Sequence, residues 1–204
     1  MDSRKYLLVA TALAAMTAGG WVSWRFLQPP ALPQTATVLP AAMELADFSL
    51  LDQHGNAFTR DSFKGEWNLV FFGFTHCPDV CPVTLQVLAD ARRQMQAAGR
   101  AKLPRIIFIS VDPERDTPAL VGQYVAHFGD GMLGVSGDLV ELRKLTSGLG
   151  IYFEKSTVDG DSYSVDHSAA VLVIDPDGRF HALFGAPHSA AGFAHDLPLL
   201  MQQR

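Results

Sequence analysis

The sequence predicts a layered α/β domain with a mixed central sheet, preceded by an apolar N-terminal segment. Two apolar runs, Trp67–Phe74 and Arg105–Val111, have the length and composition of strands that are buried on both faces. Each run is followed by a segment with helical periodicity, and later strand pairs are separated by turn residues. Strands that alternate with helices and then pair as a hairpin favour a layered sandwich.

The N-terminal segment predicts a membrane anchor. Residues 1–5 carry two basic side chains, and residues 6–27 then stay uncharged until Arg25. A helix of this length approximately matches a hydrocarbon core of about 30 Å, and the basic residues favour a cytoplasmic N-terminus. A cleaved signal peptide is the competing interpretation, but residues 21–26 lack a small-residue cleavage motif.

The expected location follows from this anchor. The sequence has no Arg-rich, acid-poor presequence, which favours a bacterial protein over a mitochondrial precursor. We therefore expect a single pass through a bacterial inner membrane, with the C-terminal domain in the periplasm. Residues 28–43 contain four prolines and no charge, and this composition predicts an extended, semi-rigid linker. Residues 44–204 then form one globular domain.

The elements of the domain follow in order along the chain. We expect three pairs of strands, each joined by a turn. They are Phe48–Leu51 with Ala57–Thr59, Tyr152–Ser156 with Tyr163–His167, and Ala169–Ile174 with Phe180–Phe184. The second pair, around the turn Asp159–Asp161, is expected to be a late hairpin insertion. Helices are expected from Pro82 through Met95, from Pro118 to Phe128, over Asp138–Leu149 with Asp138 as N-cap, and from Ser189, where Pro198 would kink or interrupt the helix.

Charge and cysteine content exclude two classes of protein. The net charge is -5 and no basic cluster is present, which argues against a nucleic-acid partner. Only two cysteines occur, Cys77 and Cys81, so a scattered disulfide framework is excluded. Two cysteines this close in the sequence indicate a metal-binding pair, a redox-active pair or a short structural disulfide.

The loop that carries the cysteines joins the first long strand to its helix. A helix N-terminus favours the thiolate, whereas the carboxylate of Asp79 opposes it. Two thiolates and one imidazole suit Cu(I), which accepts few ligands, whereas a structural zinc site takes four. Seven histidines are present, and counting does not choose among them. His76 adjoins Cys77, but on extended backbone neighbouring side chains point apart.

Three segments resemble the signatures of the Sco/SenC family of copper proteins. They are Phe72–Pro82, Ile109–Pro118, and Val165–Ser168 followed by Ile174–Gly178. The similarity runs from about Phe48 to the C-terminus. One departure is that Val135–Gly137 lacks the Leu-Thr-Gly expected before the third helix.

This resemblance implies a thioredoxin-like three-layer fold and copper ligation, as Cu(I), Cu(II) or both, by Cys77, Cys81 and His167. His167 would stand where thioredoxin-like folds carry a proline loop that faces the cysteine pair. Asp79 and Asp166 are candidates for orienting the ligands. The implied function is a copper chaperone, whose partner is the copper-bearing subunit of cytochrome c oxidase or another copper chaperone.

Three alternatives stay open. A thiol-disulfide oxidoreductase would use Cys77 as nucleophile and Cys81 as resolving thiol to reduce cysteines of an oxidase subunit. The three residues between the cysteines and the missing proline count against general disulfide exchange. A peroxidase of the peroxiredoxin kind is weaker, and a structural disulfide would close too short a loop to stabilise much. In an oxidising compartment the two thiols would pair when copper is absent, so copper binding would depend on their reduction.

Overall fold

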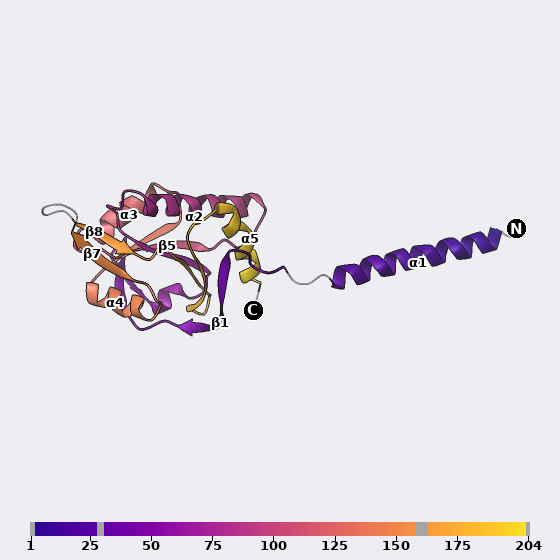
Figure 1. Ribbon diagram of the computed structural model, residues 1–204, viewed down its shortest axis with the longest axis horizontal. Helices are drawn as coiled ribbons and strands as arrows, with labels where there is room; N and C mark the ends of the chain where they lie inside the picture. Colours follow the sequence, from indigo (N-terminus) through magenta and orange to yellow (C-terminus); the bar gives the residue numbers. More distant parts are fainter. Residues whose placement is uncertain (1–2, 28–30, 158–162, 203–204) are drawn as a thin grey trace. The chain divides into compact units, whose positions relative to one another are not determined.

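The computed structural model describes residues 3–27, 31–157 and 163–202. The chain divides into two compact units, Met1–Leu32 and Pro33–Arg204 (Figure 1). The first unit is a single helix, α1 (Ser3–Leu27). Within the described ranges, no helix combines the length and the apolar character that crossing a membrane requires, α1 included. The transmembrane helix predicted over residues 6–27 is therefore not supported.

The linker prediction is wrong for residues 36–43, because they belong to a strand. β1 (Ala36–Glu44) pairs antiparallel with β10 (Arg179–Phe184), with a register shift between Val38 and Met43. Pro40 lies inside this shift, and β1 is the last strand at its edge of the sheet. Proline has no N–H to donate and is tolerated at such an edge.

The sheet of the second unit is mixed and eight-stranded, in the order β1-β10-β9-β4-β5-β6-β2-β3. Its other strands are β2 (Ser49–Asp52), β3 (Ala57–Thr59), β4 (Asn68–Gly73), β5 (Arg105–Ser110), β6 (Met132–Ser136) and β9 (Val171–Ile174). β4, β5 and β6 are parallel to one another, whereas the remaining pairs are antiparallel. The strand β6 was not expected. Its Gly134 lies so close to α3 that an added Cβ would be 2.8 Å from Val121 Cγ1.

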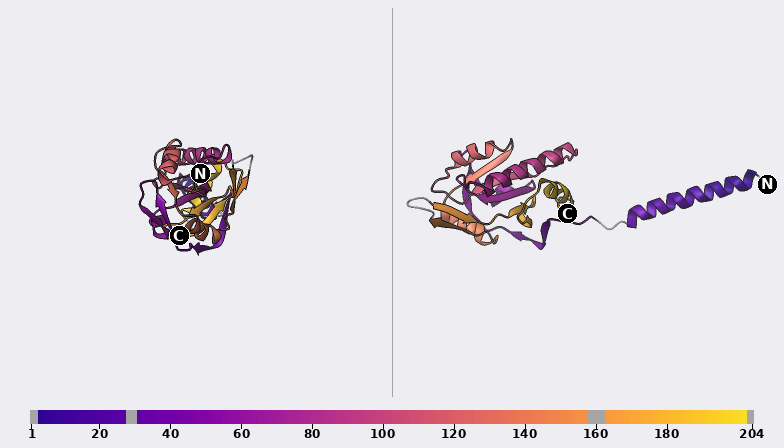
Figure 2. Two further views of the ribbon diagram at one scale, coloured as in Figure 1. Left: turned by 90° about the vertical axis from the view of Figure 1, so that its left-hand side faces the viewer. Right: turned by 45° about the horizontal axis from the view of Figure 1, so that its top comes forward.

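The helices cover both faces of this sheet. They are α2 (Val80–Ala97), α3 (Pro118–Ala126), α4 (Leu139–Ser147) and α5 (Ala190–Leu200), with a short 3-10 helix η1 (Arg60–Phe63). Right-handed crossovers place α2 and α3 on one face, and α4 lies on the other (Figures 1 and 2). α5 packs against α2.

Two predictions about helix ends have different outcomes. Asp138 caps α4 by accepting a hydrogen bond from the Val140 N–H, as expected. Pro198 does not interrupt α5, which continues to Leu200. Because Pro198 lies in the last turn, it removes only one hydrogen bond at the end of the helix.

A separate two-stranded sheet forms the late hairpin that the sequence predicts. It pairs β7 (Phe153–Thr157) with β8 (Tyr163–His167). The predicted turn Asp159–Asp161 lies outside the described residues.

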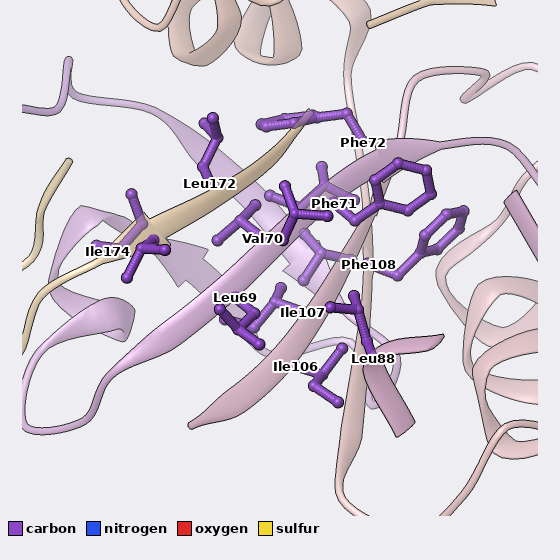
Figure 3. Close-up of a cluster of buried hydrophobic side chains, with 14 of the residues drawn as sticks. Leu69, Val70, Phe71, Phe72, Leu88, Ile106, Ile107, Phe108, Leu172 and Ile174 are labelled. Atoms are coloured by element: carbon purple, nitrogen blue, oxygen red, sulfur yellow. The ribbon is translucent and has the colours of Figure 1, made fainter. Parts of the chain in front are cut away.

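The core lies on both sides of the central strands. Every residue of β4 is buried, because helices or loops cover both faces of the sheet there. Phe71, Phe72, Ile107 and Phe108 are fully buried in this core (Figure 3). The cysteine loop therefore begins at the end of a fully buried strand.

Candidate metal centre

Cys77 and Cys81 lie where β4 ends and α2 begins. Cys77 is in the connecting loop and is partly exposed, whereas Cys81 is in the first turn of α2 and is fully buried. Gly73, the last residue of β4, makes room for the buried sulfur. A Cβ at this position would lie 2.7 Å from Cys81 Sγ.

His167 meets the two cysteines from the other end of the chain. It is the last residue of β8, and its Nε2 lies 3.3 Å from Cys81 Sγ. The Sγ atoms of Cys77 and Cys81 and one ring nitrogen of His167 all lie within 4.8 Å of one another. The structure thus brings together the three side chains that the family resemblance implied.

The hydrogen bonds of the His167 ring fix which nitrogen is free. Its Nδ1 lies 3.1 Å from the carbonyl oxygen of Ser168. A carbonyl only accepts hydrogen bonds, so Nδ1 carries the proton and Nε2 presents its lone pair toward Cys81. The rings of Phe71 and Phe74 pack edge-on against the imidazole, at centroid distances of 5.9 and 5.8 Å. The ring is therefore oriented as a metal ligand requires.

Burial favours the uncharged forms of Cys81 and His167. Burial lowers the pKa of His167, against the opposing effects of the Ser168 carbonyl and of Asp166. Burial also raises the pKa of Cys81, and the neighbouring Cys77 and Asp116 add to this rise. At Cys81 desolvation therefore exceeds the effect of the helix N-terminus, which we expected to favour the thiolate.

The cysteine loop is held by a carboxylate that sequence analysis missed. Asp116 is fully buried and accepts hydrogen bonds from the Thr75 N–H at 2.8 Å, the Thr75 hydroxyl at 2.6 Å and the Ser110 hydroxyl at 2.6 Å. Its side chain fixes the backbone two residues before Cys77. A signal was present, because the carboxyl ends of parallel neighbours such as β4 and β5 meet at the same edge of a sheet.

The acidic residues chosen from the sequence lie at the surface. Asp79 is exposed at the N-cap of α2 and makes no capping hydrogen bond with its side chain. Asp166 is exposed on β8, and because strand residues alternate it faces away from its neighbour His167. Their role in orienting the ligands stays a prediction. The ring of His76 is about half exposed, and its Nδ1 lies 3.0 Å from the Thr75 hydroxyl.

Comparisons with known proteins agree with this fold and site. A family model described as SCO1/SenC matches residues 37–202. The mitochondrial protein SCO2 homolog of Bos taurus is 36% identical over 190 residues, which span 92% of this chain and 71% of that protein.

Two solved structures are also similar to this chain. The Arabidopsis thaliana ScoI structure with copper bound is 31% identical, with a TM-score of 0.74 over 78% of this chain and 99% of that one. The Bradyrhizobium japonicum ScoI structure with copper bound is 39% identical, with a TM-score of 0.68 over 77% and 99%. They confirm the thioredoxin-like α/β fold with a mixed sheet. The chain belongs to the SCO1/SenC family.

Proposed function

We propose that this chain binds copper through Cys77 Sγ, Cys81 Sγ and His167 Nε2. The observation that carries the proposal is the convergence of these atoms within 4.8 Å, with the imidazole nitrogen already free of its proton. Two sulfurs and one imidazole suit Cu(I), which prefers soft ligands and low coordination numbers. The two related ScoI proteins that were solved with copper support the same choice of metal.

Metal analysis of the full chain tests this site. The reduced protein is titrated with Cu(I) against a chromophoric chelator, and the stoichiometry is measured by elemental analysis. We expect one copper per chain in the parent and a large loss of affinity in His167→Ala. His76→Ala is the matched control, because it removes a half-exposed imidazole beside Cys77 and should change little. Equal affinity in His167→Ala and the parent would exclude the three-ligand site.

The thiols must also be reduced for copper to bind. Oxidation would join Cys77 and Cys81 in a disulfide and remove both thiolate ligands, so the oxidised chain should take up little copper. Equal uptake by the oxidised and reduced chains would contradict this dependence.

The proposed biological role is to assist assembly of the copper centre of cytochrome c oxidase. The family resemblance supports this role, and the partly exposed Cys77 gives an incoming ligand access to the site. The proposed recipient is the copper-bearing oxidase subunit or a second copper chaperone. Mixing the copper-loaded chain with the apo form of the oxidase copper domain tests it, since the absorption bands of the loaded centre should appear. Their absence at equilibrium, with copper still on this chain, would refute direct transfer.

The proposed location is a bacterial inner membrane, with the domain in the periplasm. Arg4 and Lys5 before an uncharged stretch support this orientation, whereas no helix among the described residues is long and apolar enough to span a membrane. Alkaline carbonate extraction of expressing cells decides whether the chain is anchored by a spanning helix. A spanning anchor leaves the chain in the membrane pellet, and release into the supernatant would exclude it.

A thiol-disulfide oxidoreductase is the second candidate. The different exposure of the two cysteines favours it, because Cys77 is partly exposed, as a nucleophile requires, and Cys81 is buried, as a resolving thiol can be. Attack by Cys77 would form a mixed disulfide, and Cys81 would then close the intramolecular disulfide and release the reduced substrate. The raised pKa of Cys81 slows this second step, because thiolate is the attacking form. Insulin reduction at a rate comparable to that of thioredoxin would favour this candidate over the chaperone.

A further inference from the structure

The hairpin that carries His167 is attached to the rest of the domain through its side chains. Among the described residues, β7 and β8 pair with each other and form no ladder with the eight-stranded sheet. Phe153 and Val165 are buried in the core, and Lys155 forms an ion pair with Glu114. An isolated two-stranded hairpin is marginally stable, so its position depends on side-chain contacts. At the His167 end, the Ser168 N–H donates to the carbonyl of Tyr152 and the Tyr152 N–H donates to the Ser168 hydroxyl. These bonds join the hairpin to its own base, and they do not fix it to the cysteine side.

Tyr163 attaches the other end of β8 to the domain. Its hydroxyl donates to Asp112 Oδ1 at 2.8 Å, and its carbonyl accepts from Arg115 Nη1 at 3.1 Å. The guanidinium of Arg115 stacks on the Tyr163 ring, with Cζ 3.7 Å from the centroid. Asp112 is fully buried and also accepts from Arg115 Nε. We call Asp112, Arg115 and Tyr163 the hairpin clamp.

The hairpin clamp reaches His167 by two routes. Tyr163, Val165 and His167 alternate along β8 and therefore share one face of the strand, on which Val165 is buried. Arg115 also lies 5.7 Å from the centroid of Phe74, whose ring packs edge-on against the His167 imidazole. Displacing Tyr163 would thus move both the strand β8, which ends at His167, and the Phe74 ring that packs against the imidazole.

Two residues of the hairpin clamp, Asp112 and Arg115, lie in the same segment after β5 as Asp116, which holds the cysteine loop. Asp112 and Asp116 are four residues apart, and the backbone N–H of Asp116 donates to the carbonyl of Asp112. Asp116 fixes Thr75 before Cys77, as described above. The short segment after β5 therefore positions two parts of the site. Asp116 holds the cysteine loop, and Asp112 holds the hairpin that carries His167.

We infer that the hairpin clamp is a positioning device for the proposed copper site, which acts on His167. This inference rests on the proposed copper binding. None of the three residues is a ligand, so their contribution is to hold Nε2 within reach of the sulfurs. Groups that orient a ligand in this way commonly change metal affinity by about 10- to 100-fold when they are removed.

Tyr163→Phe tests the inference in the full chain, because it removes the hydroxyl donated to Asp112 and keeps the ring that stacks on Arg115. We expect Cu(I) affinity to fall about tenfold. In a His167→Ala background the same substitution should cause no further loss. Tyr152→Phe is the matched control, since it removes a phenol hydroxyl from an exposed side chain near the base of the same hairpin. Circular dichroism confirms that each variant is folded.

Two results would overturn the inference: an unchanged affinity in Tyr163→Phe, or an equal loss with and without His167. If the parent bound no copper, the proposed function would fail while the inference stayed testable. Nitrogen NMR of the apoprotein imidazole then decides it. The parent should show one fixed tautomer and Tyr163→Phe an averaged signal, whereas identical spectra would refute the positioning role.

Discussion

Replacing Gly73 with alanine tests how tightly the fold fits the buried sulfur. An added Cβ would lie 2.7 Å from Cys81 Sγ and 2.8 Å from Phe108 Cε2. Both neighbours are fully buried, so neither has free space into which to move. The backbone of Gly73 does not have a positive φ angle, and alanine is otherwise acceptable in a strand. Any loss is therefore steric.

The size of the effect follows from these distances. Carbon contacts are optimal near 3.5–4.0 Å, so the sulfur or the strand must shift by about 1 Å to relieve the overlap. Overpacking of this kind in a core typically costs about 1–3 kcal/mol. A shift of Cys81 would also change its 3.3 Å separation from His167 Nε2. We therefore expect Gly73→Ala to lower both the free energy of unfolding and the copper affinity.

Urea unfolding of the reduced apoprotein and chelator competition measure the two effects. Gly148→Ala is the matched control, because nothing lies within 4 Å of its added Cβ and its backbone is helical. That change should be neutral or stabilise by about 0.4–1 kcal/mol. In a Cys81→Ala background, Gly73→Ala should cost less, since one of its two clashes is gone. A Gly73→Ala protein with the urea midpoint and copper affinity of the parent would refute the steric reasoning.

Two further substitutions probe buried carboxylates. Thr75→Val removes the hydroxyl that donates to Asp116, and we expect it to lower the free energy of unfolding by about 1–3 kcal/mol in urea titrations; an unchanged midpoint would contradict this. Burial alone would raise the pKa of Asp196, but hydrogen bonds from His195, from the backbone of residues 34–36 and from the Thr35 hydroxyl outweigh it and hold the pKa well below its usual range. A lowered folded pKa gives stability that is present above the unfolded value of about 3.9 and is lost as the pH falls below it. The midpoint temperature of thermal unfolding should thus fall less between pH 6 and pH 2 in Asp196→Asn than in the parent. If the midpoints of the two proteins fell in parallel over this range, the assignment would be contradicted.

The elements that the sequence predicts best are those with strong local patterns. The all-buried strand β4 and the capped helix α4 both carry such a pattern. The strands β1 and β6 were missed because their patterns are interrupted, by Pro40 in one and by Gly134 in the other. Both become strands through tertiary contacts, since β1 pairs with β10 and Gly134 admits a close-packed helix.

The residues of the site also differ in whether the local sequence predicts them. The spacing of Cys77 and Cys81 is local and visible in the sequence, whereas His167 was chosen only through the family resemblance. Asp112 and Asp116 were missed because their partners, Tyr163 and Thr75, are distant along the chain. Of the acidic residues that were chosen, Asp166 adjoins His167 on β8 and points to the opposite face, and Asp79 is exposed at the N-cap of α2.

Burial favours the uncharged forms of two of the proposed ligands, Cys81 and His167. Burial raises the pKa of Cys81 and lowers that of His167, so both groups are uncharged at neutral pH. Cys81 Sγ lies 3.3 Å from His167 Nε2, so two of the three proposed ligands are within hydrogen-bonding distance of each other. Copper binding must displace the thiol proton of Cys81, because the metal needs both the thiolate and the imidazole lone pair. The contact between Cys81 and His167 joins the cysteine loop to the hairpin, and the loop that carries Asp112 and Asp116 supports each side of it.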